Sequence, residues 1–128
     1  MYVLLILYNM DIQYYDLDDK YSKLTFPKTF EECCNVLNIS TELPNFHRFD
    51  LHLFYQLIIC VKAYHKICNY TANFKDNNTK FVISNYCGKI VTNTSNRTNY
   101  LLNFPSPLVR NIFQHNFNDL IKKVIDYI

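Results

Sequence analysis

The stretch 49–68, FDLHLFYQLIICVKAYHKIC, decides the expected fold. Its apolar residues recur at the spacing of one helical face, which predicts an amphipathic helix. The residues on this face are Leu53, Leu57, Val61, Tyr64 and Cys68, and Phe54 with Ile58 widens it. Beyond the first turn, only Lys62 and Lys66 carry a full charge. We therefore expect a central helix over about 50–68 that other elements surround and that is the most buried element of the chain.

Two local signals mark the start of this helix. The carboxylate of Asp50 can accept a hydrogen bond from an unpaired backbone N–H, so Asp50 is the expected N-cap. Phe49 and Phe54 then have the spacing of a hydrophobic staple. The sequence thus predicts a capped helix whose first turn is fixed by an apolar contact.

Composition limits the domain number and the function classes. A chain of 128 residues with 49% hydrophobic residues, ten Phe and eleven Tyr can build one core, as one domain or one domain with a helical appendage. The net charge of +2 gives no electrostatic basis for binding nucleic acid or a membrane surface. A single glycine disfavours a many-stranded sandwich. No apolar run approaches the ~20 residues of a transmembrane helix.

Cysteine usage and sequons point to different compartments. The chain has five cysteines, an odd number, and two of them are adjacent, which favours reduced thiols in cytoplasm or nucleus. They are Cys33, Cys34, Cys60, Cys68 and Cys87. The alternative is a small secreted glycoprotein, because five asparagines begin N-x-Ser/Thr sequons: Asn38, Asn69, Asn77, Asn93 and Asn96. The apolar run 2–8 lacks the basic residues and cleavage site of a signal peptide, so we expect an intracellular protein with unmodified sequons.

The region before the central helix predicts a strand and a helix. The apolar residues 3–8 fit either a strand or the start of a buried helix. The charged residues of 16–20 predict a polar turn. Alternation over 21–26 predicts a short strand that ends at Pro27. Thr29 with Glu32 forms a capping-box pattern that predicts a helix from Phe30, with an apolar face of Phe30, Cys33, Cys34 and Leu37.

The region after the central helix mixes loops with helix signals. Residues 69–80 and 92–99 are polar and predict loops, whereas 81–91 fit either a strand or a poor helix. Ser106-Pro107 predicts a helix start, and Asn118 can cap a last helix that continues to 128. Together these elements predict a helix-dominated α+β fold, in which a small sheet packs against a helical cluster around the helix at about 50–68.

No set of residues predicts a chemical reaction. His52, Cys60, His65 and Cys68 share the central helix, but without a C-x-x-C pair we interpret them as core residues rather than zinc ligands. No nucleophile signature surrounds a cysteine, and Gly88 alone cannot form a phosphate loop. We therefore assign no catalytic, cofactor-binding or metal residue and expect a protein that is not an enzyme.

The order of elements resembles the second half of a BTB/POZ domain. The matching pieces are the expected strand 22–26, a helix opening with Phe30-Glu31, the turn Ser40-Thr41-Glu42-Leu43 and a helix from Leu53 to Cys68. The start, LLILYN followed by Tyr14-Tyr15, is similar to the segment before this half, and NYLLNFPSPLVRNIF is similar to the C-terminal part of BTB proteins of AT-rich large DNA viruses. The resemblance implies an N-terminally incomplete BTB-like domain over 1–75 and a C-terminal helical extension over 76–128.

The resemblance also implies a function. BTB domains mediate protein–protein interaction, and the implied role is a viral adaptor in a host–virus interaction that recruits a cullin-type ubiquitin-ligase scaffold. The face between the helices at 30–37 and 51–68 would meet the scaffold, and helices over 105–127 would extend the contact. The opening Asp-Val strand and a His in the second strand of the family are missing, which brings the usual homodimer into question.

Two further resemblances remain as alternatives. FPSPLVRNIF followed by Asp119-Leu120 is similar to the F-box-like motif at the C-terminus of poxviral ankyrin proteins, although Pro107 replaces the acidic residue. LFYQLIICVK could instead be the central helix of a viral apoptosis-regulator bundle. Each alternative implies a protein partner and neither implies an enzyme.

Overall fold

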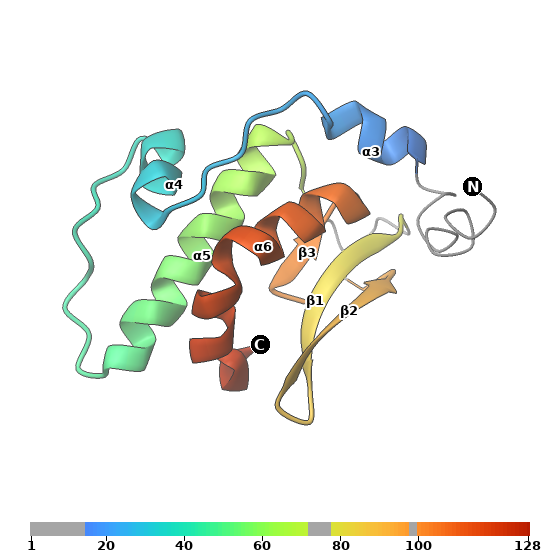
Figure 1. Cartoon of the computed structure of the whole chain (residues 1–128). Helices are drawn as coiled ribbons and strands as arrows, with labels where there is room; N and C mark the ends of the chain where they lie inside the picture. The colour runs from blue at the N-terminus through green and yellow to red at the C-terminus, as the bar shows by residue number, and fades with distance from the viewer. Residues whose placement is uncertain (1–14, 72–77, 98–99) are drawn as a thin grey trace.

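The computed structural model describes residues 15–71, 78–97 and 100–128 and shows a helix-dominated α+β fold, as predicted. The elements are α3 (Tyr15–Tyr21), α4 (Phe30–Leu37), α5 (Phe49–Ile67), β1 (Lys80–Tyr86), β2 (Lys89–Ser95), β3 (Leu102–Phe104), α6 (Pro107–Lys123) and a 3₁₀ turn, η1 (Ile125–Tyr127). α4 packs on α5, and α6 contacts α3, α5, β1 and β3. α6 therefore connects the helices on one side with the sheet on the other (Figure 1).

The sheet is antiparallel with the strand order β2-β1-β3. The β1–β2 hairpin turns at Cys87 and Gly88, which both have positive φ values, 53° and 81°, as a tight hairpin turn with the twist of the strands requires. Residues 81–86 and 89–91 thus belong to strands on either side of this turn. The prediction of a loop over 92–99 is wrong for residues 92–95, which belong to β2. These residues pair with Lys80–Ile83 of β1, so tertiary pairing overrides their polar composition.

Two predictions before α4 are wrong. Residues 22–26 form no strand, because no strand lies beside them among the described residues. The expected polar turn at 16–20 belongs to α3 instead, with Asp16 and Asp18 in the first turn and Lys20 in the last, which suits the helix dipole. The sheet comes entirely from 80–104, so the region 76–128 supplies all three strands as well as α6, rather than helices alone. Residues 3–8 lie outside the described residues, as does the expected domain boundary between 75 and 76.

The predicted starts of α4 and α6 are confirmed. Thr29 Oγ1 accepts from the Glu32 backbone N–H at 3.1 Å, and Glu32 Oε2 accepts from the Lys28 N–H rather than from that of Thr29. At the start of α6, Ser106 Oγ accepts from the Val109 N–H at 3.2 Å and Pro107 occupies the first turn. The expected break before Asn118 is a kink within α6, at Phe117.

The expected start of α5 is wrong. Arg48 is the N-cap and makes no capping hydrogen bond with its side chain, whereas Asp50 lies within the first turn. Phe49 is 76% exposed and therefore makes no hydrophobic staple. The carboxylate of Asp50 is bound by Arg48 and Tyr127 instead, so a contact from the C-terminal end of the chain fixes this turn.

Burial along α5 is uneven. Its buried residues lie in the C-terminal half: Leu57, Ile59, Cys60, Val61, Ala63 and Tyr64. Residues 51–56 are only half-buried, whereas every residue of β3 is buried. The prediction that the central helix is the most buried element is therefore wrong for its N-terminal half.

Tyr64 is the centre of the core. Its ring stacks on Phe26 at 4.9 Å and meets Phe113 edge-on at 4.9 Å, measured between ring centroids. Its hydroxyl donates to the Pro27 carbonyl oxygen at 2.8 Å and accepts from Asn116 Nδ2 at 3.0 Å. One buried side chain thus connects α5, α6 and the connection before α4.

Candidate interaction surface

A groove forms where α4, α5 and α6 meet, and we call it the helical groove. Its volume is about 290 Å³. The lining residues are Lys28, Thr29 and Phe30 from the start of α4, Leu53 and Gln56 from α5, and Asn116, Phe117, Asp119, Leu120 and Lys123 from α6. Three elements that are distant in sequence therefore contribute to one concave surface.

The helical groove combines apolar and charged side chains. Phe30, Leu53 and Leu120 line it and are only half-buried, so each keeps apolar surface in contact with solvent. Lys28 and Lys123 are among its exposed lining residues. Apolar side chains beside polar ones are also found in protein interfaces, where an anchor side chain is desolvated and the polar residues around it exclude water.

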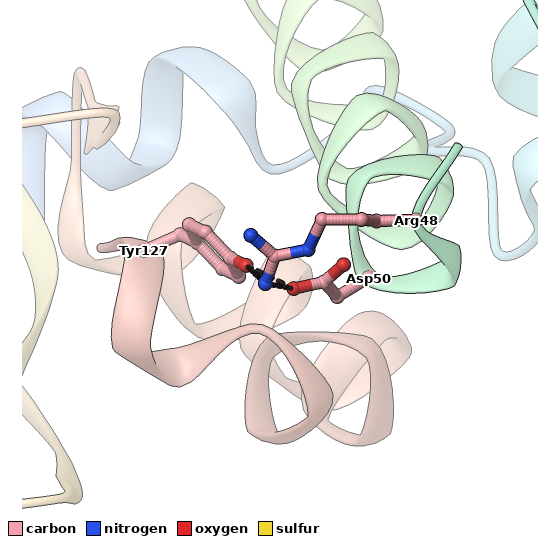
Figure 2. A network of polar contacts seen from close by, with 3 residues as sticks. All are labelled: Arg48, Asp50 and Tyr127. Atoms are coloured by element: carbon pink, nitrogen blue, oxygen red, sulfur yellow. Dashed lines mark hydrogen bonds and ion pairs between the residues drawn. The ribbon is translucent and has the colours of Figure 1, made fainter. Parts of the chain in front are cut away.

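A contact near the C-terminal end of the chain joins η1 to the start of α5 (Figure 2). Arg48 Nη2 lies 2.6 Å from Asp50 Oδ2 and 3.0 Å from the Tyr127 hydroxyl oxygen. The Tyr127 hydroxyl donates to the same Asp50 oxygen, and the Tyr127 ring lies 5.5 Å from that of Phe54. The Tyr127 hydrogen bond, followed by the charge of Arg48, lowers the pKa of the Asp50 carboxyl. This contact holds the end that follows α6 beside the start of α5.

His52 and His65, the two histidines of α5, contact backbone carbonyl oxygens rather than a set of metal ligands. His65 Nε2 donates to the Asn103 carbonyl oxygen at 2.7 Å, which covers the outer edge of β3, and His52 Nε2 lies 3.1 Å from the Phe46 carbonyl oxygen. Burial lowers the pKa of His65, so its neutral form is favoured. Within 15–71, 78–97 and 100–128, no three His, Cys, Asp or Glu side chains form a group that could hold a metal ion.

The cysteines are free thiols, and only Cys87 is exposed. A hydrogen bond with the Cys33 thiol, together with burial, raises the pKa of Cys60, and burial raises the pKa of Cys68 to about 11. Burial also raises the pKa of Cys34. Because the thiolate is the nucleophile, these raised pKa values make the three thiols poor nucleophiles at neutral pH.

Sequence reasoning missed most of the helical groove. A signal for it exists, because Asn116, Asp119, Leu120 and Lys123 have the spacing of one helical face and mix polar with apolar residues. Leu53 and Gln56 are similarly spaced on α5. The sequence does not show that these faces of α5 and α6 meet beside the start of α4.

None of the comparisons with family models, curated proteins or solved structures finds a match to this chain. Among the helices of the described residues, none has the length and hydrophobicity needed to cross a membrane.

Proposed function

We propose that this chain is a non-enzymatic protein-interaction module that binds its partner through the helical groove. In its most specific form, the proposal is a virus-encoded adaptor that recruits a cullin-type ubiquitin-ligase scaffold, as BTB proteins do. The observation that carries the proposal is the set of half-buried apolar side chains from α4, α5 and α6 that line one groove.

The groove suits an apolar anchor from a partner protein. A Leu, Met or aromatic side chain could contact Phe30, Leu53 and Leu120 and remove their remaining apolar surface from water. Lys28 and Lys123 would contact polar groups around this anchor. The groove needs no conformational change to accept such a side chain, since its walls belong to packed helices.

The BTB form of the proposal rests on the helix pair α4–α5. Its support is that α4 and α5 pack on each other and that α6 contacts α5 and lines one groove with both helices. The strand over 22–26 is missing, so the likeness is limited to this helix pair. The F-box-like resemblance covers 104–113 and Asp119-Leu120. Within 104–113 only Leu108, Asn111 and Ile112 are not buried, so most of these side chains contribute to the core rather than to a contact surface.

Two observations support a non-enzymatic, intracellular role. His65 uses one ring nitrogen to bind a backbone carbonyl, and buried thiols with raised pKa values are poor nucleophiles. The five cysteines are free, as expected in the reducing cytoplasm or nucleus. Under this proposal the exposed sequon residues Asn38, Asn69, Asn93 and Asn96 stay unmodified.

A calorimetric titration of the purified chain with a purified cullin-type scaffold tests the proposal. We expect Leu53→Asp and Leu120→Asp to weaken binding by at least about tenfold, since each places a charge against the apolar anchor. Tyr86→Asp is the matched control, because Tyr86 is 69% exposed on the β1–β2 hairpin, away from the groove. Absence of wild-type binding would reject the cullin partner. Equal binding by all variants, with unchanged thermal melts, would reject the groove.

A further inference from the structure

The connection between α3 and α4, residues 22–29, has unused backbone hydrogen-bonding groups. It crosses over α5 with no strand drawn beside it (Figure 1). Within the described residues, the backbone groups of Lys23, Thr25 and Phe26 form no hydrogen bond to another segment. Unpaired N–H and C=O groups of this kind are the template on which an added β-strand pairs.

A hollow runs beside this connection. It has a volume of about 460 Å³ and lies between residues 25–28 and the side of α4 that carries Glu32, Asn35 and Val36. Phe26 and Pro27 are buried, and the stacking of Phe26 on Tyr64 holds the connection against the core. The hollow therefore has a fixed wall, and an added chain could place a side chain in it.

The sequence of the connection suits pairing. Residues 21–26 alternate in sequence as in a strand, and Pro27 ends the pattern. In the structure Tyr21 ends α3 and residues 22–23 form a turn in which the Leu24 N–H donates to the Tyr21 carbonyl oxygen, so the part outside helix and turn begins at Leu24. The connection has the strand signal, but no strand of residues 15–71, 78–97 and 100–128 pairs with it, which explains why the predicted strand is not formed there. A strand supplied by another protein would satisfy both the sequence pattern and the free backbone groups.

The positive charge of the connection indicates which kind of added strand could pair with it. Lys23 and Lys28 are exposed near the two ends of the connection, and residues 22–29 contain no acidic residue. A second copy paired antiparallel over 23–28 would place Lys23 opposite Lys28 at both ends, which is unfavourable. Glu32, on the facing wall, is bound to the backbone N–H of Lys28. The complementary occupant is therefore an extended segment of a different protein, with acidic residues on both sides of an apolar one.

We propose that residues 23–28 bind an acidic extended peptide of a partner protein by β-strand addition, with an apolar side chain of the peptide in the hollow beside α4. The site deepens the proposed interaction function and rests on it. Lys28 lines both sites, but the hollow otherwise uses Glu32, Asn35 and Val36 of α4, whereas the helical groove uses Phe30. Carboxylates of the peptide would pair with Lys23 and Lys28, and its backbone would pair with that of Thr25, which lines the hollow.

The probe is an acetylated, amidated peptide of sequence Asp-Val-Thr-Val-Thr-Asp, whose two carboxylates have the same separation in sequence as Lys23 and Lys28, titrated to millimolar concentration against ¹⁵N-labelled protein. We expect saturable shifts of the amide signals of residues 23–26 and 28, since Pro27 has no N–H. The matched control peptide, Lys-Val-Thr-Val-Thr-Lys, should bind at least about tenfold more weakly because two favourable charge pairs become repulsive. The double variant Lys23→Glu, Lys28→Glu should reverse this preference.

Two further measurements separate the alternatives. A peptide with N-methylated valines keeps its side chains but cannot donate from those amides, so its binding should be lost; equal binding would overturn strand addition. Absence of shifts at 23–28 with the unmodified peptide would overturn the site itself. Leu120→Asp should weaken scaffold binding and leave peptide binding unchanged. Wild-type protein that binds the peptide but not the scaffold would reject the helical groove as the scaffold site and leave the strand site standing. Wild-type protein that binds the scaffold but not the peptide would reject the strand site alone.

Discussion

The two halves of α5 have different neighbours and different roles. Residues 57–64 lie against the core and include six buried side chains, whereas residues 51–56 are half-buried and contribute Leu53 and Gln56 to the helical groove. One apolar sequence thus supplies both a core and an exposed contact surface. Hydrophobicity alone therefore does not distinguish residues that stabilise the fold from residues available to a partner.

Two tyrosines show the same contrast. Tyr64 and Tyr127 each form hydrogen bonds that join residues distant in sequence, but Tyr64 is fully buried and Tyr127 is 39% exposed. A hydrogen bond lost in the interior leaves its partners without water, whereas an exposed partner is resolvated. Equivalent substitutions at the two sites should therefore have very different effects.

The largest effect is expected from Leu57→Ala. Leu57 is fully buried, so its truncation should lower the free energy of unfolding by about 2–5 kcal/mol. Ile58→Ala is the matched control: Ile58 is the next residue of α5 but only half-buried, and its truncation should cost less. Urea denaturation followed by circular dichroism measures both. A larger loss for Ile58→Ala would contradict the assignment of the buried face.

A smaller effect is expected from Tyr64→Phe. The ring contacts remain, but the Pro27 carbonyl and the Asn116 amide lose a partner, at a cost of about 1–3 kcal/mol. Tyr127→Phe removes the corresponding hydroxyl at the surface and should shift the urea midpoint much less. Similar shifts for the two variants would show that burial does not set the contribution of these hydroxyl groups.

A pH dependence is expected from His65. Its folded-state pKa is lowered by burial, so the unfolded state binds more protons and the free energy of unfolding should fall as pH decreases below about 6.5. His65→Gln can keep a donor towards the Asn103 carbonyl while removing the titration. Urea midpoints measured between pH 5 and pH 8, the range in which histidine titrates, should show a flatter profile for the variant than for the wild type. An identical pH profile would contradict the assigned role of His65.

The smallest effect is expected at the Arg48–Asp50–Tyr127 contact. The lowered pKa of Asp50 means that its contribution is present above the usual carboxyl pKa and is lost as pH falls through the folded-state value. Because these groups are solvent-exposed, Asp50→Asn should change the thermal midpoint little, and added salt should reduce the difference. A large drop in the midpoint at low salt would show that this contact is more important for stability than exposure implies.

Local signals in the sequence predicted several elements because the relevant interactions lie within a few residues. Thr29 with Glu32 marked the start of α4, Ser106 with Pro107 marked the start of α6, and the apolar spacing of 53–68 predicted a helix. These patterns depend on backbone geometry within one or two turns.

The remaining features depend on contacts between distant residues. Asp50 has the residue type of an N-cap but is bound by Tyr127, and the polar residues 92–95 are strands because β1 pairs with them. The segment 22–26 has a strand pattern but no strand beside it. The helical groove requires α4, α5 and α6 to meet, which no local pattern encodes.

Hydrogen exchange along α5 tests the difference between its two halves most directly. Native-state exchange measured by NMR over a series of low urea concentrations gives an opening free energy for each amide. We expect the amides of residues 57–64 to open only with global unfolding, and those of 51–56 to open at a lower free energy through local fraying of the half-buried turns. Equal opening free energies along the whole helix would contradict the account, because α5 would then be a single uniformly stabilised element.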